Sequence, residues 1–410
     1  MKNRMPNLRH LRAFREVVHT HSVSAAAERV FLSQSALTQA LAKLEASLGC
    51  ALFQRKHNGL FLTEEGKLFD QRVARCLLLL QLGVREALRQ GERKDPGLRT
   101  SVDPAQGLTN AHLRALLAVQ HAPNFSSAAR AIGISQPAVY KAAHDLEAVL
   151  NIILFEKTSI GVNLTRAALR LARQVRLALK EISQGYDELS SFSGSDSTTL
   201  VVGSMPLART YILPSAINRI SALRPDVSVS VVEGPYDDLL QRLLFGEVDF
   251  LIGALRDPAP TTDMVQEALF DTELSVVARH DHPLAQHTGL TRADLSGYRW
   301  VVPRSGTPAR RYFDQVFTEH DATVLQGLVE CSSQVVIREL LTGSDRLTFI
   351  SSHQVQHEQE EGILRVLHTD IPIMRRPIGL TLRAGWHPTP TQRLFVSIIK
   401  SLSDRVGQTL

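Results

Sequence analysis

The chain has 410 residues, a length that predicts about two to four domains. Hydrophobic residues make up 44% and charged residues 21%, which is typical of folded proteins and excludes a largely disordered chain. The formal net charge is +5, from 46 Lys and Arg against 41 Asp and Glu.

The charge is distributed unevenly. Residues 1–198 hold 26 Lys and Arg against 17 Asp and Glu, whereas residues 199–410 hold 20 against 24. A basic half joined to a mildly acidic half predicts a module that binds a polyanion, attached to a module with another task. Charge alone leaves DNA, RNA and a membrane open as the polyanion.

The sequence gives no sign of export or of a membrane span. Met1 leads into a charged segment and not into an apolar signal core. The apolar run that begins at Cys76 is far shorter than the ~20 residues of a spanning helix. The other cysteines, Cys50 and Cys331, form no CxxC pair with it, so neither a disulfide framework nor a zinc site is expected. We expect a cytoplasmic protein that holds no metal and contacts no membrane.

The basic half contains a repeat, because it aligns with itself without a gap at an offset of 102 positions (113 − 11). The register is kept at polar as well as apolar positions, which chance similarity between two alanine- and leucine-rich stretches does not explain. The matched segments include Leu11-Arg12-Ala13 with Leu113-Arg114-Ala115, Ala26-Ala27 with Ala128-Ala129, Ser33-Gln34 with Ser135-Gln136, Leu44-Glu45-Ala46 with Leu146-Glu147-Ala148, and Leu62-Thr63 with Leu164-Thr165.

The first unit is predicted to begin with three helices. Apolar residues recur at helical spacing from Leu8 onward. We place Ser24 as the N-cap of a short alanine-rich helix that ends at Leu32, and Ser33 as the cap of a third helix over residues 34–48. This order, with a tight turn before a polar-fronted helix, is the helix-turn-helix arrangement.

The front of the third helix and the hairpin after it are suited to DNA. Hydroxyl and amide side chains can bond base edges in a major groove. A basic hairpin tip fits a wing that lies along phosphates. These side chains are Gln34, Ser35, Thr38 and Gln39 on the helix, and Arg55 and Lys56 on the wing.

A long helix capped by Thr63 follows the wing. The leucine-rich face of this long helix is too large for a single helix to bury. This favours pairing with another helix over burial within its own domain. The second unit repeats the order: Ser135 and Gln136 open its third helix, Lys157 lies in its wing, and Thr165 caps a second long helix. Residues 91–106 are predicted as a linker and residues 185–197 as a hinge, which gives domains over residues 1–90, 107–190 and 198–405.

The first unit resembles the DNA-binding domain of the LysR-type transcriptional regulators. The resemblance implies contact with double-stranded DNA, and it is carried by Ser24-Ala25-Ala26-Ala27, Ser33-Gln34-Ser35-Ala36-Leu37-Thr38, Leu44-Glu45, Leu48-Gly49, Leu52-Phe53-Gln54-Arg55 and Leu62-Thr63-Glu64-Glu65-Gly66. Over both units, the expected DNA-binding residues are Ser24, Ser33, Gln34, Ser35, Thr38, Gln39, Arg55, Lys56, Ser135, Gln136, Tyr140, Lys141 and Lys157.

The second unit departs from the family pattern at several positions. Tyr140 replaces a small hydroxyl residue, Asn151 replaces a glycine, and residues 165–168 lack the acidic residue and the glycine. The apolar positions survive, so the fold is expected to be intact. Base reading by this unit stays open, because tyrosine is bulkier than serine in a groove.

From Thr199 onward, short β-branched runs alternate with helical stretches, which predicts an α/β domain with a largely parallel sheet. Two lobes with a ligand between strand ends follow from the general rule for open sheets. Strands are expected over residues 200–203, 227–232, 248–252, 274–278, 300–302, 326–329, 347–350 and 378–382. Helices are expected over residues 214–223, from Asp237, from Thr307, from Ser333 and over residues 391–402.

This half resembles the co-inducer-binding domain of the same family, which is similar to periplasmic binding proteins. The whole chain is then a multi-domain protein: two α-rich winged helix-turn-helix units followed by an α/β two-lobed domain. The resemblance implies a bacterial cytoplasmic regulator that responds to a small molecule, with RNA polymerase as a candidate partner. The segments that carry it are Leu213-Pro214, Pro225-Asp226-Val227, Val232-Glu233-Gly234 and Leu243-Leu244-Phe245-Gly246-Glu247-Val248-Asp249.

We expect no cofactor. We do expect a small-molecule effector that is anionic or rich in hydroxyl groups. Helix N-termini near arginines favour anions, and an aromatic residue after the second strand supplies a wall. A capped helix or a solvated arginine is the alternative at each position. The expected effector-binding residues are Ser204, Arg209, Tyr236, Thr307, Arg310 and Ser333.

Other functions fit the sequence less well. Cys331 has no partner cysteine in its half for a dithiol switch, and the histidines at 280, 282 and 287 lie in a loop where solvation is the better interpretation. No GxSxG, HExxH or P-loop motif is present, so we expect no enzyme, although scattered Asp, His and Ser residues do not exclude weak catalysis. A transport-type binding protein would leave the two basic helix-turn-helix units unexplained.

The duplication suggests a mechanism. In family members with one unit, the long helices pair between two chains. Here they can pair within one chain, so that a monomer imitates a DNA-binding dimer and a homo-oligomer covers more half-sites. The alternative is that the second unit serves assembly and only the first reads bases. The expected pairing residues are Leu77, Leu80 and Val84 with Leu169, Leu171 and Leu177.

Overall fold

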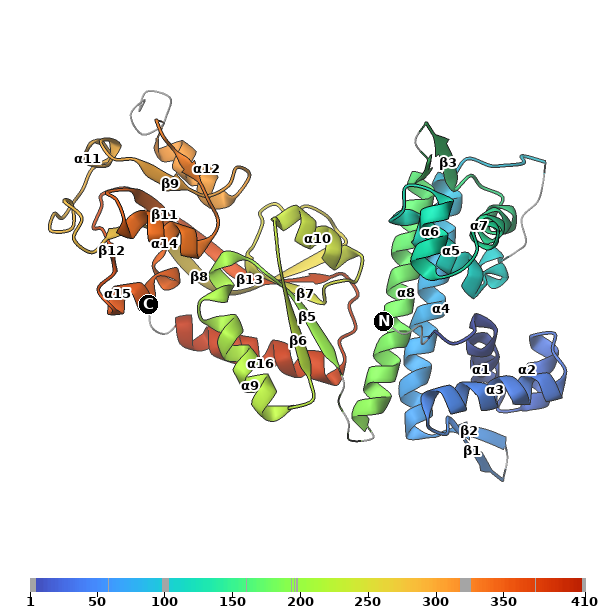
Figure 1. Cartoon of the computed structure of the whole chain (residues 1–410). Coiled ribbons are helices and arrows are strands. Elements are labelled where there is room, and N and C mark those ends of the chain that lie inside the picture. Colours follow the sequence, from blue (N-terminus) through green and yellow to red (C-terminus); the bar gives the residue numbers. More distant parts are fainter. Residues whose placement is uncertain are drawn as a thin grey trace. The chain divides into compact units, whose positions relative to one another are not determined.

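A computed structural model of the chain describes residues 5–57, 59–97, 103–159, 161–192, 194, 196, 198–317, 326–372 and 374–407. It divides into two compact units, residues 1–198 and residues 199–410 (Figure 1). No helix of the described residues is long and apolar enough to cross a membrane.

The first compact unit contains the two repeats. The first repeat consists of α1 (Leu8–Thr20), α2 (Val23–Arg29), α3 (Gln34–Leu48), β1 (Phe53–Lys56), β2 (Gly59–Leu62) and α4 (Glu64–Gln90). After η1 (Pro104–Gly107), the second consists of α5 (Asn110–Gln120), α6 (Phe125–Ile132), α7 (Gln136–Leu150), β3 (Phe155–Thr158), β4 (Gly161–Leu164) and α8 (Arg166–Phe192). Each repeat is therefore a winged helix-turn-helix followed by a long helix.

The duplication extends to individual hydrogen bonds. Glu45 Oε1 accepts the backbone N–H of Leu52 at 2.7 Å, and Glu147 Oε1 accepts that of Leu154 at 2.9 Å. Both partners in the second bond lie 102 positions after those in the first. In each repeat this glutamate connects the third helix to the wing. The matched residues Glu45 and Glu147 therefore have the same structural role.

Three details of the first compact unit differ from the prediction. The N-cap of α2 is Ser22, which accepts from the N–H of Ala25, so Ser24 lies inside the first turn. That helix ends at Arg29 and not at Leu32, because the chain needs residues for the turn into α3. The segment predicted as a hinge from residue 185 is helical as far as Phe192, because its buried face packs on α4.

The turn before each third helix requires a left-handed residue. In the second repeat this residue is Gly133, at φ 70°, whereas in the first it is Phe31, at φ 54°. The Phe31 side chain is 94% exposed. A bulky residue is strained in this conformation, and Phe31 has no burial to offset the strain.

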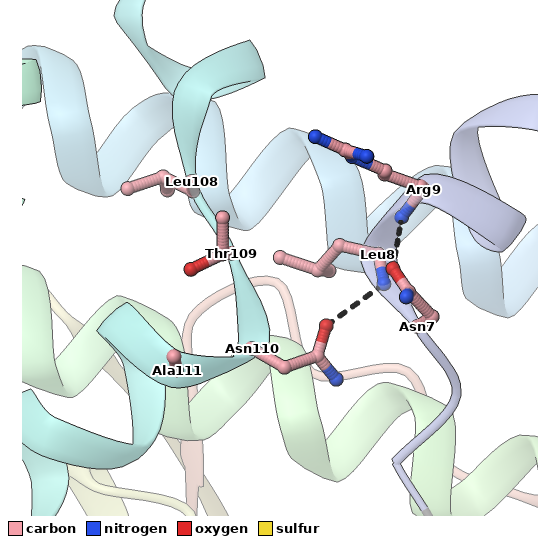
Figure 2. Close-up of a pocket in the computed structure, with 7 residues that line it drawn as sticks. All are labelled: Asn7, Leu8, Arg9, Leu108, Thr109, Asn110 and Ala111. Carbon is pink, nitrogen blue, oxygen red and sulfur yellow. Dashed lines mark hydrogen bonds between the residues drawn. The ribbon is translucent and has the colours of Figure 1, made fainter. Parts of the chain in front are cut away.

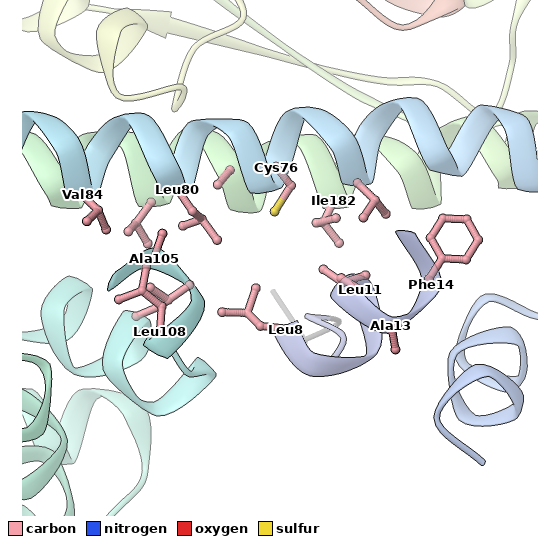
Figure 3. Packing of buried hydrophobic residues seen from close by; sticks show 14 of the residues in the cluster. Leu8, Leu11, Ala13, Phe14, Cys76, Leu80, Val84, Ala105, Leu108 and Ile182 are labelled. Atoms are coloured by element: carbon pink, nitrogen blue, oxygen red, sulfur yellow. The ribbon is translucent and has the colours of Figure 1, made fainter. Parts of the chain in front are cut away.

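The long helices α4 and α8 pack side by side within the chain, as the sequence predicted, and they run antiparallel (Figure 1). Leu80, Val84 and Leu171 are buried in one hydrophobic cluster that includes both repeats. Figure 3 shows Leu80 and Val84 of α4 above Ala105 of η1 and Leu108, which follows η1. Two predicted pairing residues lie outside this cluster: Leu169 is on the outer face of α8 and is 41% exposed, and Leu177 is half-buried.

Two glycines at matched positions let the long helices approach closely. A Cβ at Gly83 would lie 2.7 Å from Cβ of Gln174, and one at Gly185 would lie 3.4 Å from Cβ of Arg72. Gly185 follows Gly83 by 102 positions, and Gln174 follows Arg72 by the same number. The two contacts are therefore related by a pseudo-two-fold axis through the helix pair.

An ion cluster breaks this symmetry. Arg72 donates to Glu181 at 2.8 Å and to Glu188 at 2.5 Å, with all three side chains at most 10% exposed. Arg75 also pairs with Glu181, at 3.0 Å. Burial lowers the pKa of Arg72, but its bonds to the two glutamates outweigh burial and raise that pKa overall. At the matched position Gln174 carries no charge, so the cluster exists at one end of the pair only.

The first helices of the repeats also meet across the pseudo-two-fold axis. The backbone N–H of Leu8 donates to Oδ1 of Asn110 at 2.9 Å, and Asn110 Nδ2 donates to the carbonyl of Pro6 (Figure 2). Leu8 and Asn110 are themselves matched positions. Arg12 reaches across to the carbonyl of Ala105 at 2.8 Å. Both repeats are thus joined by polar bonds as well as by the shared core.

Asn151, which stands where the family has glycine, holds the linker. It adopts the left-handed conformation at φ 52°, which asparagine tolerates better than most residues. Its Oδ1 accepts the N–H of Asp95 at 2.9 Å, and its Nδ2 donates to the carbonyl of the same residue at 2.7 Å. The departure from glycine therefore attaches the chain after α4 to the second repeat.

The second compact unit is an α/β domain with strand order β10-β9-β11-β8-β13-β7-β5-β6, and β12 pairs with β8. Its strands are β5 (Thr199–Ser204), β6 (Ser228–Glu233), β7 (Phe250–Ala254), β8 (Met264–Arg279), β9 (Trp300–Val302), β10 (Val329–Glu330), β11 (Leu347–Ser351), β12 (Leu364–Val366) and β13 (Arg375–Arg383). Its helices are η2 (Pro206–Arg209), α9 (Ile212–Leu223), α10 (Tyr236–Leu244), α11 (Arg292–Ser296), α12 (Pro308–Val316), α14 (Gln334–Thr342), η3 (Ser352–Gln354), α15 (Gln356–Glu360) and α16 (Pro390–Gly407).

Two lobes follow from this order. The strands β5, β6 and β7 are parallel in one lobe, as are β9, β10 and β11 in the other, and the antiparallel β8 and β13 run between them. Separate hydrophobic clusters lie on the two faces of each lobe. The sequence predicted only residues 274–278 of β8, which begins ten residues earlier, at Met264. The strand predicted over residues 326–329 is confined to Val329–Glu330.

Candidate functional site

The front of α3 is an exposed surface with a shallow hollow. The residues that line the hollow are Ser33, Gln34, Ser35, Thr38, Gln39 and Ala42. Ser33 caps the helix by accepting the N–H of Ala36 at 3.2 Å, and its hydroxyl lies 3.0 Å from that of Ser35. Thr38 bonds the carbonyl of Gln34 at 2.9 Å, which fixes its rotamer. Five of the six residues were predicted from sequence, and Ala42 supplies the floor.

The wing of the first repeat presents its basic residues to solvent. Arg55 and Lys56 are exposed on β1, and Lys56 Nζ lies 5.6 Å from the ring centroid of Phe61 on β2. Phe61 is stacked on His21, which follows α1. This contact attaches the wing to the helices. Ser24 is exposed in the first turn of α2, and Asn58 at the hairpin tip lies outside the described residues.

The front of α7 has the same position in the second repeat but a different surface. Gln136 Oε1 accepts the hydroxyl of Ser126 at 2.6 Å. The Tyr140 ring is 45% exposed and lies edge-on to Phe125 and His144, at centroid distances of 5.4 and 4.1 Å. Lys141 is exposed beside it. The other two predicted residues of this repeat, Ser135 at the helix start and Lys157 on the wing, are exposed as well.

The electrostatics of the second repeat centre on Glu147. Burial raises the pKa of Glu147, but bonds from the backbone N–H groups of Leu154 and Phe155, together with the charge of Lys94, lower it overall. Lys94 Nζ lies 2.9 Å from the carboxylate. The linker thus supplies a cation to the junction between recognition helix and wing, which the first repeat does not have among its described residues.

The effector-binding residues predicted from sequence fall into separate groups in the second compact unit. Ser204 is fully buried, and Arg209 pairs with Glu233 at 2.9 Å. The helix after Ser204 is a single 3-10 turn, so the anion-binding helix start predicted there does not form.

The other predicted group lies at the start of α12. Thr307 caps this helix by accepting the N–H of Arg310 at 3.2 Å. Arg310 is itself paired with Asp314 at 2.8 Å and with Glu330 at 3.1 Å. Ser333 precedes α14 and makes no side-chain cap bond. No hydrogen bond or ion pair among the described residues joins these groups, and both predicted arginines already have carboxylate partners.

Two arginines that the sequence did not single out are better placed to bind an anion. Arg256 Nη1 and Arg376 Nε are buried and have no hydrogen-bond partner among the described residues. Burial, and then the charge of Arg256, lowers the pKa of Arg376 to about 10, so it is still protonated at neutral pH. Burial also lowers the pKa of Arg256, and the charge of Arg311 on α12 adds to this.

Predicted Tyr236 belongs to this cluster, because the guanidinium of Arg256 lies 4.4 Å from its ring centroid. Arg376 is paired in β-sheet register with Thr272, whose hydroxyl bonds that of buried Ser351. Together these residues form a cationic patch with an aromatic wall and hydroxyl groups beside it. The sequence signal was weak, because isolated arginines in a chain rich in arginine reveal their burial only after folding.

The structure adds no observation in favour of metal sensing or redox sensing. No group of His, Cys, Asp and Glu suited to a metal is found among the described residues. The prediction that His282 is solvated is wrong, since it is 3% exposed and accepts the N–H of Leu284. It closes its own loop, and burial lowers its pKa.

Comparison with known families gives matches over most of the chain. Residues 193–403 match the family described as LysR substrate binding domain. Residues 8–67 and 111–169 each match the family described as bacterial regulatory helix-turn-helix protein, lysR family. Two separate matches to one family support the duplication inferred from the internal alignment.

Similar proteins are named as transcriptional regulators. The HTH-type transcriptional regulator GalR of Pseudomonas putida is 37% identical over 400 residues, which cover 97% of this chain and 98% of that protein. The regulator PcaQ of Agrobacterium fabrum is 27% identical and covers 70% of this chain and 93% of its own length. A solved full-length OxyR variant from Pseudomonas aeruginosa shares the fold, with a TM-score of 0.55 at 22% identity over 73% of this chain and 95% of that one.

Proposed function

The chain belongs to the LysR family of bacterial transcriptional regulators, and from that premise we propose that a single chain reads two neighbouring DNA half-sites. It is a sequence-specific DNA-binding regulator whose activity responds to a small-molecule effector. The observation that carries the proposal is the antiparallel pairing of α4 with α8 inside one chain. Two winged units related by a pseudo-two-fold axis are the arrangement that places recognition helices in successive major grooves.

The proposed readers are the exposed fronts of α3 and α7. In the first unit Gln34 and Gln39 offer amides and Thr38 a hydroxyl, which suit base edges. In the second, Gln136, Tyr140 and Lys141 take these roles. The wing residues, Arg55 and Lys56 in the first unit and Lys157 in the second, contact phosphates and fix the register on the duplex.

The test compares footprints of the full-length chain on DNA that it selects from a random library. Gln34→Ala and Gln136→Ala are each expected to weaken protection of one half-site, since a base contact contributes ~1–3 kcal/mol. Gln71→Ala, an exposed glutamine on α4 outside both fronts, is the matched control. Unchanged protection with Gln136→Ala, alongside loss with Gln34→Ala, contradicts two-site reading and favours a second unit that serves assembly.

We further propose that the effector is an anion held by Arg256 and Arg376. The charge of Arg256 acts on Arg376, and each of these half-buried arginines has one buried N–H nitrogen without a hydrogen-bond partner among the described residues. An anionic ligand would relieve the repulsion between the two guanidinium groups and bond these N–H groups. Tyr236 would form the aromatic wall. Among the residues predicted from sequence, Ser204, Arg209, Thr307, Arg310 and Ser333 are then supporting residues and not the primary contacts.

A thermal-shift screen of the full-length chain against small carboxylates and phosphates tests this. A hit should stabilise the chain, and Arg376→Met should abolish the shift. Arg375→Met is the control, because Arg375 is its exposed neighbour and pairs with Glu273 on the surface. A shift of equal size in the Arg376→Met chain would contradict the assignment.

We place this regulator in the cytoplasm, where bacterial DNA is, and propose that it has no catalytic activity of its own. Association into homo-oligomers and contact with RNA polymerase stay predictions from the family resemblance.

A further inference from the structure

We infer that the DNA site bound by one chain of this protein is not palindromic and that each chain binds its site in one orientation. The inference rests on the proposed function, in which both helix-turn-helix units read bases. Two identical units related by a two-fold axis read two identical half-sites in opposite directions. The two units of this chain share a fold but not a reading surface.

The difference lies at the positions that face outward. Subtracting 102 from a residue number in the second unit gives its counterpart in the first, and the inner faces of α3 and α7 match well under this rule. The outer positions do not: Pro137 corresponds to Ser35, Tyr140 to Thr38, Lys141 to Gln39 and His144 to Ala42. Where Ser35, Thr38, Gln39 and Ala42 line a hollow on α3, larger side chains stand on α7.

The chemistry at these positions selects different bases. Gln39 can both donate and accept, which suits the paired N6 and N7 groups of adenine, whereas Lys141 only donates and suits the acceptors of guanine. Thr38 is short and bonded to the carbonyl of Gln34. Tyr140 is held upright between Phe125 and His144, so its ring cannot turn away from the groove without losing both contacts.

Even the glutamine that the two units share is presented differently. Gln136 Oε1 accepts the hydroxyl of Ser126 on α6, and this bond uses one of the two acceptor sites of its amide oxygen. Ser24 is the counterpart of Ser126, and no bond between Ser24 and Gln34 is found in this described part of the chain. Gln34 therefore keeps a donor and an acceptor for a base, while Gln136 offers chiefly donors.

The parts that face phosphates differ as well. Glu64, exposed at the start of α4, corresponds to Arg166 at the start of α8. Lys56 on the first wing corresponds to Thr158 on the second. Each unit therefore has its own distribution of charge toward the backbone, so the two ends of the reading pair are distinguishable even on uniform DNA.

Covalent linkage makes the asymmetry permanent. Every chain holds one unit of each kind, and the Arg72 ion cluster needs α4 and α8 together. A second α8 in place of α4 would set Gln174 opposite Glu188, with no arginine to pair it. A pair of two identical readers is thus disfavoured, and the chain presents one first-unit surface and one second-unit surface to DNA.

The experiment begins with selection of bound sequences from a random duplex library by the full-length chain. Repeating the selection with Gln34→Ala assigns one half of the motif to the first unit, because information at that half should be lost. Three duplexes of equal spacing are then compared by titration: the selected site, and the two palindromes made from either half alone. The selected site is expected to bind roughly tenfold or more tightly than both palindromes.

Two grafts test the cause. Pro137→Ser with Tyr140→Thr and Lys141→Gln gives the second unit the first unit's outer residues, and should move the preference to the first-half palindrome. Ser35→Pro with Thr38→Tyr and Gln39→Lys is the reciprocal graft, and should move it to the other palindrome. Because the grafts alter different units, failure of one to fold leaves the other as a test.

The outcomes separate the two proposals. Protection of a single half-site overturns two-site reading and this inference with it. Protection of two half-sites, with either palindrome bound within about twofold of the selected site, leaves two-site reading intact and overturns the asymmetry alone.

Discussion

At the scale of single residues, a few side chains carry the connections on which the reading surfaces depend. Glu45 and Glu147 join recognition helix to wing through the same backbone N–H groups in the two repeats. Only Glu147 also receives a cation from the linker, because Asn151 holds the chain beside Lys94. The second wing is therefore positioned partly by an ion pair, and this makes it sensitive to pH.

The lowered pKa of Glu147 gives the sign of that sensitivity. A carboxylate whose folded pKa lies below its unfolded value of about 4.3 contributes its full stability above the unfolded pKa and loses it as pH falls through the folded value. Protection of the Leu154 and Phe155 amides from hydrogen exchange should hold from pH 7 to about pH 5 and decline below about pH 4. Glu147→Gln should reduce protection at pH 7 and flatten this decline.

Glu45→Gln is the matched control, since its effect should be confined to the first wing. Protection factors of the second wing that fall equally in wild type and Glu147→Gln as pH is lowered would contradict the assignment to Glu147.

A second residue-scale prediction concerns Phe31. Replacing it by glycine, the residue at the matched position 133, removes left-handed strain of about 1–2 kcal/mol, offset in part by the entropy that glycine gains in the unfolded chain. Phe31→Gly is expected to slow amide exchange in α2 and α3 several-fold. Faster exchange there would refute the assignment of strain to Phe31.

At the scale of elements, the α4–α8 pair decides how the repeats are arranged. Each long helix has an apolar face that its own repeat covers incompletely, and the partner helix covers the remainder. Gly83 and Gly185 set the separation, because they remove side chains where the backbones approach. Cys76 is buried in this cluster, and burial raises the pKa of its thiol to about 12.

The glycines differ in how much room they leave. Alanine improves helix propensity by up to about 1 kcal/mol at either position. At Gly83, however, the new Cβ would meet Gln174 Cβ at 2.7 Å, which the helix backbone must move to relieve. A Cβ at Gly185 would lie 3.1 Å from Cδ2 of Phe69, a less severe contact. We therefore expect Gly83→Ala to destabilise the pair by ~1–2 kcal/mol and Gly185→Ala to destabilise it less. Amide exchange in α4 and α8 measures both, and a larger effect at Gly185 would refute this order.

At the scale of the whole molecule, the structure places two winged helix-turn-helix units and the α4–α8 pair within one chain. The ion cluster at Arg72 offers a test of this arrangement against an exchange of long helices between two chains. Arg72→Glu should abolish tight DNA binding, because it sets three carboxylates together, and adding Glu188→Arg in the same chain should recover much of it.

Mixing chains then distinguishes the arrangements. Co-expressed Arg72→Glu and Glu188→Arg chains each keep one unmatched contact if α4 and α8 pair within a chain, so DNA binding should stay weak. Recovery in the mixture would require α4 of one chain to pair with α8 of another, and would refute the monomeric reading pair.

The sequence alone determined the repeat, the winged helix-turn-helix units, the two-lobed domain and the exposure of the polar residues at the fronts of α3 and α7. Each depends on local information: periodicity of apolar residues fixes the helices, caps such as Ser33 fix their starts, and polar residues on an outer face stay exposed however the units pack. The pairing of the long helices also followed, because their apolar faces required a partner, although Leu169 was placed on the wrong face.

Tertiary structure alone decided what depends on neighbours distant in sequence. Arg209 and Arg310 looked available until Glu233 and Glu330 were seen beside them, while Arg256 and Arg376 gained their burial from strands far along the chain. Likewise, nothing local distinguishes Gly83 from a helix-weakening glycine or marks Arg72 as the partner of Glu188. The periodicity of apolar residues can be recognised from neighbours along the chain. The electrostatic partners of a residue are set by long-range packing, which only the folded molecule provides.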